Sequence, residues 1–279
     1  MVEIVLSKEY FNITDTLTCG QIFRFSEYNG GYAVFSCDKL CFLFERGDNV
    51  VIQTKEEDEN YFKTFFDLDR DYKEIVNSAL NGEYQMLSVS AEVGKGIRIL
   101  KQDETETLFS FMISQNNNIK RIKLIIDRLC TALGEEKEFN GVKYHAFPKV
   151  EVMAKKDEEF YKSIGLGYRA EYIRRLAVDI NNGFDILGYS NLTTPELKKA
   201  LCKIYGVGEK VADCVSLFGF NRFDSFPVDT WIEKVYKDYF NGTLTDRKKI
   251  TEWFISKFKN NSGIYQQYLF HYKRNIEKK

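Results

Sequence analysis

The chain has 279 residues, of which 44% are hydrophobic and 29% charged, and its formal net charge is −1. This composition is typical of a soluble globular protein with one large or two ordinary domains, and no apolar run approaches the roughly 18 residues of a membrane span. The opening residues lack the basic start and apolar stretch of a signal peptide, so we expect a protein that stays inside the cell.

Charge is divided unevenly along the chain. Residues 1–95 hold 9 Lys and Arg against 17 Asp and Glu, whereas the remainder holds 31 against 24. An acidic part joined to a basic part fits a phosphate-binding body with an appended domain, although solvated surfaces often give the same division. The six cysteines form no C-x-x-C pair and there are only two histidines, so a zinc site or iron–sulfur cluster lacks a ligand set.

The N-terminal part is predicted to form a small antiparallel sheet. Strands are predicted at 21–28, 32–36, 40–46 and 50–54. The connections are short, and Asn29-Gly30-Gly31 supplies the positive φ angles that a tight hairpin needs. One face of such a sheet must be covered, and the apolar spacing at 61–68 and 72–80 predicts the covering helices.

From about residue 96 the apolar period changes from 2 to 3.6, which predicts a helical body. Helices are predicted at 104–115, 119–133, 169–182, 195–204, 209–218, 230–239, 246–259 and 263–275. The predicted fold class is therefore α+β, with an antiparallel sheet domain and its covering helices at 1–95 and an all-α domain at 96–279.

Two of the predicted helices are joined by a short turn, Gly206-Val207-Gly208, which forms a helical hairpin. Glycines allow backbone angles and close approach that a Cβ would forbid. The free N–H groups that begin the second helix then point outward, next to the positive end of its dipole, and form a seat for phosphate. A hairpin that binds no ligand is the alternative, because short glycine patterns are common.

Lys210 lies in the first turn of that second helix, where the dipole disfavours a cation. We expect partial burial between Ile204 and Val211, and an amine that loses its proton more readily than a free lysine and can form a Schiff base. Asp229 precedes another apolar run, so it is a natural N-cap. A carboxylate facing the amine could also stabilise a cation developing at a sugar C1′.

The pattern "GVGEKVADC" followed by "FPVDTW" resembles the helix-hairpin-helix, Gly/Pro…Asp superfamily of DNA glycosylases. Further stretches narrow the resemblance to the 8-oxoguanine DNA glycosylase/AP lyase family. They are "LTCGQIFRF", "FMISQNNNIKRI", "HAFP", "IGLGYRAEYI" and "YQQYLF", spread in the family's order over residues 17–270. The resemblance implies a TATA-binding-protein-like sheet domain and a helix-hairpin-helix at about 195–218.

The resemblance also assigns catalytic and phosphate-binding roles. Lys210 matches the lysine that attacks C1′, displaces the damaged base and permits β-elimination, and Asp229 matches the aspartate that stabilises the transition state. The backbone of Gly206, Gly208 and Val211 would bind phosphate. No cofactor is implied, although a cation could be held at the hairpin by the backbone carbonyls of Cys202, Ile204 and Val207.

Recognition of the flipped base and of its partner is implied for other positions. The carbonyl of Gly20 would accept the N7–H that 8-oxoguanine has and guanine lacks. Phe270 and Cys214 would sandwich the purine, with Gln266 on its Watson–Crick edge. The remaining implied contacts are Phe218 and Pro227 in the pocket wall, and Asn116, Arg121, Tyr168 and Arg169 at the gap and the opposite cytosine.

Core packing accounts equally well for Phe218, Phe270 and Cys214, and surface charge is the alternative for both arginines. Trp231 stands where relatives often have a phosphate-binding histidine, which puts that contact in doubt. The expected partner is duplex DNA containing 8-oxoguanine, bound by a monomer in a prokaryotic cytoplasm, or in the nucleus if the source is eukaryotic. A glycosylase for other oxidised or alkylated bases, and a non-catalytic DNA-binding module, remain as alternatives.

Overall fold

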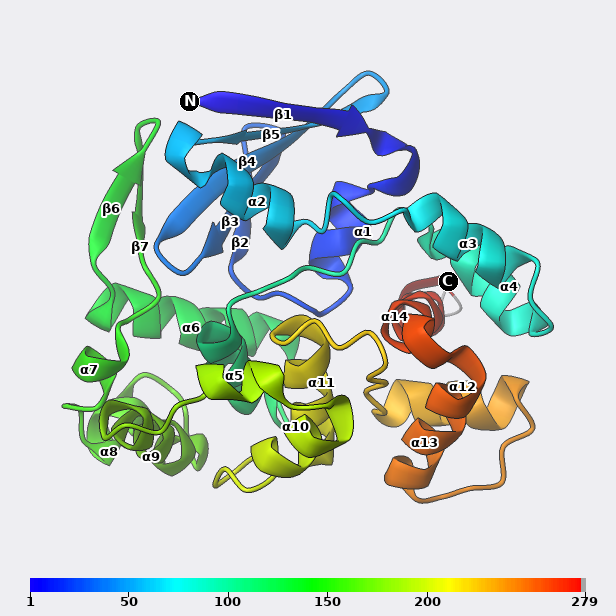
Figure 1. Cartoon of the computed structure of the whole chain (residues 1–279). Coiled ribbons are helices and arrows are strands. Elements are labelled where there is room, and N and C mark those ends of the chain that lie inside the picture. The colour runs from blue at the N-terminus through cyan, green and yellow to red at the C-terminus, as the bar shows by residue number, and fades with distance from the viewer. Residues whose placement is uncertain (277–279) are drawn as a thin grey trace.

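The computed structural model describes residues 1–276 and places an antiparallel sheet against a helical body (Figure 1). The sheet has the strand order β1-β5-β4-β3-β2. Its strands are β1 (Val2–Ser7), β2 (Phe25–Tyr28), β3 (Gly31–Ser36), β4 (Lys39–Arg46) and β5 (Asn49–Thr54). The four predicted strands are confirmed. The edge strand β1, whose side chains alternate between half-buried and exposed, was not predicted.

One face of the sheet packs on α1 (Ile13–Thr18) and α2 (Glu59–Phe65). Phe62 and Phe65 contribute to this core, so the covering helix predicted at 61–68 is confirmed. The other face is covered by the hairpin β6 (Glu136–Phe139) and β7 (Val142–His145), where Phe139 stacks on Phe42 of β4 at 5.6 Å between ring centroids.

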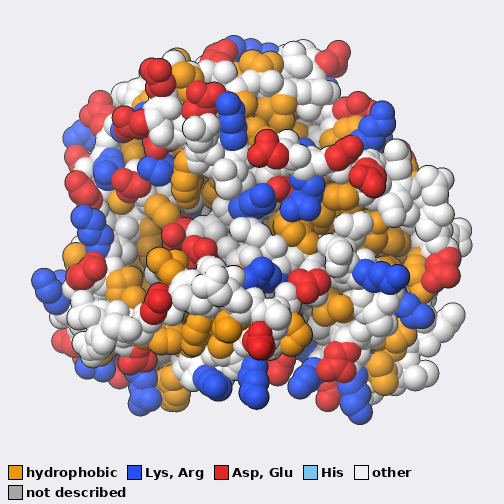
Figure 2. All heavy atoms as spheres, in the orientation of Figure 1, with side chains coloured by type: hydrophobic (Ala, Val, Ile, Leu, Met, Phe, Trp, Pro, Cys, Tyr) orange, Lys and Arg blue, Asp and Glu red, His pale blue; other side chains and the backbone are white. Residues whose placement is uncertain are grey.

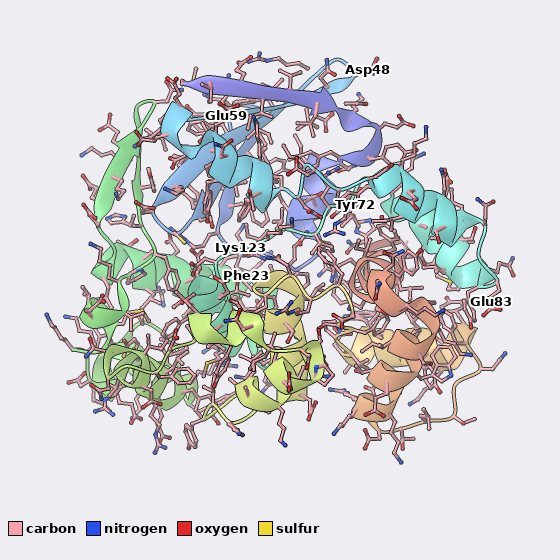
Figure 3. The ribbon with its side chains drawn as sticks, viewed as in Figure 1. Phe23, Asp48, Glu59, Tyr72, Glu83 and Lys123 are labelled. Atoms are coloured by element: carbon pink, nitrogen blue, oxygen red, sulfur yellow. The ribbon has the colours of Figure 1, made fainter. Side chains whose placement is uncertain are left out.

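Two expectations about these regions were wrong. The body that follows residue 96 is not all-α, because it contains the β6–β7 hairpin. The second predicted cover, α3 (Tyr72–Leu80), packs in the helical core with α4 (Gln85–Gly94) and not on the sheet. Apolar spacing shows that a helix has a buried face but not which partner buries it. Figure 3 shows Tyr72 at the junction of the sheet and the helical body, where its hydroxyl accepts the Ile99 N–H.

Helix α14 lies inside the helical body, and its residues from Ser262 to Leu269 are all buried. The longer helices of this body are α5 (Glu104–Ser114), α6 (Ile119–Leu133), α9 (Arg169–Asn181), α10 (Thr194–Leu201), α11 (Glu209–Phe218), α12 (Thr230–Tyr239), α13 (Arg247–Phe258) and α14 (Ser262–His271). Shorter helices are α7 (Val150–Met153) and α8 (Glu158–Ser163). All eight predicted helices are present, and the largest differences lie at the ends of α10 and α14. In residues 1–276 none of the helices has the length and hydropathy that crossing a bilayer requires.

The distribution of charge on the surface agrees in part with the sequence, in which residues 1–95 are acidic and the remainder is basic. Figure 2 shows Lys and Arg side chains along the lower edge of this face, over α9, α10 and α13.

Within the fold, a buried ion pair joins Arg24 to Glu106 of α5 at 3.2 Å. The same guanidinium donates to the backbone carbonyls of Cys37 and His145, so it links the sheet, the β6–β7 hairpin and the helical body.

Replacing Arg24 with methionine is expected to lower the free energy of unfolding by about 3–5 kcal/mol, because Glu106 then stays buried without its charge partner. Burial already raises the pKa of Glu106. Losing the cation would raise that pKa further, so the deficit should shrink as the pH falls and the carboxylate is protonated. Urea unfolding at several pH values measures both effects. Arg46→Met removes an exposed pair with Glu3 and should cost less than about 1 kcal/mol; equal losses in the two variants would contradict this account.

Candidate active site

One small pocket lies where the segment after α1 meets α11 and α14. It is lined by Cys19, Gly20, Phe111, Lys210, Cys214, Phe218, Pro227, Asp229, Gln266, Gln267 and Phe270. Both residues predicted to be catalytic and all six predicted for base recognition are therefore brought together. The cavity volume is about 50 Å³, which holds a few water molecules but not a purine. A base can enter only if the walls move apart.

The hairpin between α10 and α11 has the geometry that its glycines predict. Gly206 has φ +88°, and a Cβ there would lie 2.5 Å from the Tyr172 ring. Gly208 is the N-cap of α11, and a Cβ there would meet nothing within 4 Å. The first N–H groups of α11 therefore face open space, as a phosphate seat requires.

Lys210 is the second residue of α11 and lines the pocket, but its side chain is exposed. The expected burial between Ile204 and Val211 was wrong. Val211 is only 3% exposed and points into the core. Lys210, the residue before Val211, is exposed and also lines the pocket, so its amine is accessible both to solvent and to the pocket.

Asp229 faces the same pocket from the start of α12. Its Oδ1 atom accepts the N–H groups of Trp231 at 2.9 Å and of Ile232 at 3.0 Å, so the predicted N-cap is present. Capping uses one carboxylate oxygen, and the side chain is half-buried. The residue can therefore anchor the helix and present negative charge to the pocket at once.

The walls that would hold a base are neutral and well fixed. Burial raises the pKa of Cys214 to about 12, so its thiol stays protonated at physiological pH. Phe218 stacks on Phe111 with centroids 5.5 Å apart. Gln266 donates to the Pro227 carbonyl at 3.1 Å and accepts from Gln267 at 2.6 Å, so its amide orientation is set by two neighbours.

Sequence reasoning missed three residues of this pocket: Cys19, Phe111 and Gln267. Cys19 adjoins Gly20 and could have been found by that adjacency. Burial raises its pKa to about 12 as well, so it adds a second neutral thiol. Phe111 carried no signal, because an apolar residue in an apolar helix does not reveal what it contacts. Gln267 could have been found only as a polar residue inside an otherwise buried helix.

A second group of predicted residues lies at the turn between α5 and α6. Asn116 is exposed and adopts φ +45°, which is uncommon for a residue other than glycine. Arg169 is only 4% exposed and donates from Nε and Nη2 to the Gln115 carbonyl, and from Nη2 to the Asn116 carbonyl at 2.9 Å. Surface charge is thus the wrong interpretation of Arg169, which holds the turn that carries Asn116.

The two other residues of this group are open to solvent. Tyr168 is 53% exposed, and the Arg169 guanidinium lies 4.4 Å from the centre of its ring. Arg121 is exposed and donates to the Gly165 carbonyl at 3.3 Å. The arrangement presents an asparagine, an aromatic ring and a cation together on one side of the turn.

Of the three carbonyls predicted to hold a cation, that of Ile204 accepts the Val207 N–H at 3.0 Å. Among residues 1–276, no group of three or more His, Cys, Asp or Glu side chains is placed to hold a metal ion.

Comparison with known proteins gives matches over nearly the whole chain. A family described as "8-oxoguanine DNA glycosylase, N-terminal domain" matches residues 3–108, and "HhH-GPD superfamily base excision DNA repair protein" matches residues 109–260. The crystal structure of Clostridium acetobutylicum 8-oxoguanine glycosylase/lyase with duplex DNA, containing cytosine opposite 8-oxoG, superposes with a TM-score of 0.92. It is 35% identical, and the alignment covers 99% of this chain and 96% of that one.

Two curated relatives agree with this match. The N-glycosylase/DNA lyase OGG1 of Arabidopsis thaliana is 32% identical over 63% of this chain, and the alignment spans 52% of the plant protein. A probable N-glycosylase/DNA lyase of Methanothermobacter thermautotrophicus is 27% identical over 79% of this chain and 75% of its own length.

Proposed function

The chain belongs to the HhH-GPD superfamily of base excision DNA repair proteins, and we propose that it is a bifunctional glycosylase/lyase that excises 8-oxoguanine opposite cytosine from duplex DNA. The observation that carries the proposal is the single pocket that unites Lys210 and Asp229 with Gly20, Gln266 and Phe270. An amine, a carboxylate, an aromatic ring and an amide meet there although they come from remote parts of the sequence.

In the proposed reaction, the target nucleotide leaves the stack and its base enters between Cys214 and Phe270. The Lys210 amine forms a bond to C1′ as the bond from C1′ to the base breaks, and the base leaves with the bonding electrons. The negative charge of Asp229 stabilises the positive charge that develops on the sugar. The attached amine gives up one proton, which the displaced base takes up. The C1′–O4′ bond then breaks as the C1′–N double bond forms, and O4′ takes up a proton from solvent, which leaves a protonated Schiff base. Removal of a C2′ proton gives an enamine, whose electrons break the bond from C3′ to the phosphate oxygen as the conjugated Schiff base forms and the phosphate leaves.

Selection of the lesion would depend on one hydrogen bond. The Gly20 carbonyl would accept N7–H from 8-oxoguanine, whereas guanine has an acceptor at N7 and would leave two acceptors facing each other. A buried polar group left without a partner costs about 1–3 kcal/mol. Gly20 has φ +92°, a conformation that side chains rarely adopt, so this position favours glycine on conformational grounds as well.

Borohydride trapping on duplex DNA with a single 8-oxoguanine opposite cytosine tests the proposal. Reduction of the Schiff base should give a stable covalent adduct between protein and DNA. No adduct with the wild-type protein would exclude the lyase. Adducts on an alkylated base but not on 8-oxoguanine would favour the alternative substrate, and binding without any product would favour a non-catalytic module.

Arg169→Ala is expected to reduce the preference for cytosine opposite the lesion by about tenfold, because the Asn116 turn loses the guanidinium that holds two of its carbonyls. Excision rates opposite each of the four bases measure the preference. Arg175→Ala, on the same helix but in an exposed pair with Glu171, serves as the control. An unchanged set of rate ratios in Arg169→Ala would count against this role.

Three further expectations stay as proposals. The sheet domain at 1–95 would contribute one wall of the pocket, and the catalytic domain at 96–279 would carry the residues that perform the chemistry. The carbonyls of Cys202, Ile204 and Val207 would hold a monovalent or divalent cation beside the bound phosphate. The enzyme would work as a monomer on the DNA of a prokaryotic cytoplasm, or in the nucleus if the source is eukaryotic.

A further inference from the structure

Arg274 lies just outside the pocket and has no place in the reaction described above. It follows α14 in the π-helical turn Tyr272–Ile276. Its guanidinium carbon is 4.8 Å from the centre of the Phe270 ring, within the range of a cation–π interaction. Its Nη2 atom donates to the backbone carbonyl of Thr18, two residues before Gly20. One side chain therefore contacts the two neighbouring wall segments of the pocket that carry Gly20 and Phe270.

The contact with the glycine segment is close. A Cβ added to Gly20 would lie 3.2 Å from Nη1 of Arg274 and 3.6 Å from Cε1 of Phe270. Gly20, the aromatic ring and the guanidinium are thus packed against one another. A Cβ at position 20 would require the Arg274 guanidinium to shift by a few tenths of an ångström.

Burial lowers the pKa of Arg274, and the nearby Asp229 carboxylate partly offsets this effect. A guanidinium remains protonated at physiological pH even when such groups surround it. Nε donates to the side chain of Asn275 at 3.0 Å, which fixes the plane of the group from its other side. The arginine is therefore held in a defined orientation.

Phe270 needs such support. It is only half-buried, whereas its neighbours in α14 from Ser262 to Leu269 are buried. A half-exposed ring can change rotamer when a base is absent, and reordering it on binding would cost conformational entropy. The Arg274 guanidinium contacts the ring and is itself held by its hydrogen bond to the Thr18 carbonyl, so it restricts this motion before the base arrives.

We propose that Arg274 is a positioning residue for base recognition, which holds the Phe270 ring in a fixed orientation beside the Gly20 turn. The inference rests on the proposed function, because ring and turn contact a base only if the pocket accepts one. It predicts a residue that acts on excision of the base and not on the later chemistry at the sugar.

The test compares two substrates that differ only in the presence of the base. One duplex carries 8-oxoguanine opposite cytosine, and the other carries a preformed abasic site opposite cytosine. In Arg274→Met, single-turnover excision of 8-oxoguanine should fall about tenfold, the loss expected when a partly desolvated cation–π contact and a charged hydrogen bond disappear. Cleavage at the abasic site should stay within about twofold of wild type, because no base occupies the pocket. That rate also reports whether the variant is folded.

Three further variants sharpen the result. Arg274→Lys keeps a cation over the ring and should recover part of the excision rate. In a Phe270→Leu background, which has no ring, adding Arg274→Met should cost less than about twofold, since the two residues act through one contact. Arg46→Met, which removes an exposed arginine of β4 that pairs with Glu3, should leave both rates unchanged.

The results on the two substrates distinguish failure of the positioning role from failure of the proposed function. Equal losses on both substrates, or no loss on either, would overturn the positioning role. Faster excision in Arg274→Met would also overturn it, because the arginine would then obstruct the pocket. A wild-type protein that cleaves abasic sites but leaves 8-oxoguanine in place would overturn the proposed function itself, and this role with it.

Discussion

Lys210→Gln is expected to abolish both base excision and strand cleavage while leaving affinity for the damaged duplex nearly unchanged. Glutamine is similar in length and polar, but its amide nitrogen is not a nucleophile and cannot form a Schiff base. The excision rate should fall on the order of 10⁴-fold, as when other enzymes lose their nucleophile. Because Lys210 is exposed, the free energy of unfolding should change by less than about 0.5 kcal/mol.

Lys248→Gln is the matched control. Lys248 is also exposed and also the second residue of its helix, α13, but it does not line the pocket. Single-turnover excision, borohydride trapping and gel-shift binding should separate the two variants, with Lys248→Gln retaining product formation. If Lys210→Gln still cuts at the wild-type rate, another group is the nucleophile.

Asp229→Asn is expected to lower the excision rate about 10²–10³-fold with little loss of stability, because electrostatic stabilisation of a transition state typically contributes a factor of that size. The amide oxygen of asparagine can accept the same N–H groups of Trp231 and Ile232 that the carboxylate accepts, so the helix keeps its cap. Only the negative charge is removed. Single-turnover kinetics and thermal unfolding, measured on the same samples, distinguish charge from capping.

Asp246→Asn provides the comparison for this second substitution. Asp246 caps α13 in the same way, with Oδ1 accepting the N–H groups of Lys248 and Lys249, and it lies outside the pocket. Its excision rate should match wild type. An Asp229→Asn protein of full activity would show that charge at this position is not used, and the aspartate would then be a cap alone.

Several elements could be predicted closely because their ends carry chemical signals. Helix α6 begins where Asn118 caps it by accepting the Arg121 N–H, and α11 begins directly after Gly208. The β6–β7 hairpin was missed because its strands are short and charged. Its turn, Asn140-Gly141, has positive φ at both residues, and this pair is a recognised hairpin signal that the sequence does contain.

The candidate site shows a different limit. The resemblance to the glycosylase family predicts that Lys210 and Asp229 share a site, and both line one pocket from the starts of two helices. Spacing could not show that Arg169 is buried, because its partners are backbone carbonyls of residues 115 and 116, in the turn between α5 and α6. Arg274 was invisible for the same reason. Phe270 is only four residues away along the helix, but the Thr18 carbonyl becomes a neighbour only when the two ends of the chain meet.

The place of α14 near the end of the described chain has a consequence for synthesis on the ribosome. The hairpin and Lys210 are made before Gln266 and Phe270, which belong to the buried helix α14 and line the same pocket. Under the proposed function, a nascent polypeptide would therefore contain the nucleophile before the residues that contact the base. Selectivity for the base would be completed last, when α14 enters the core.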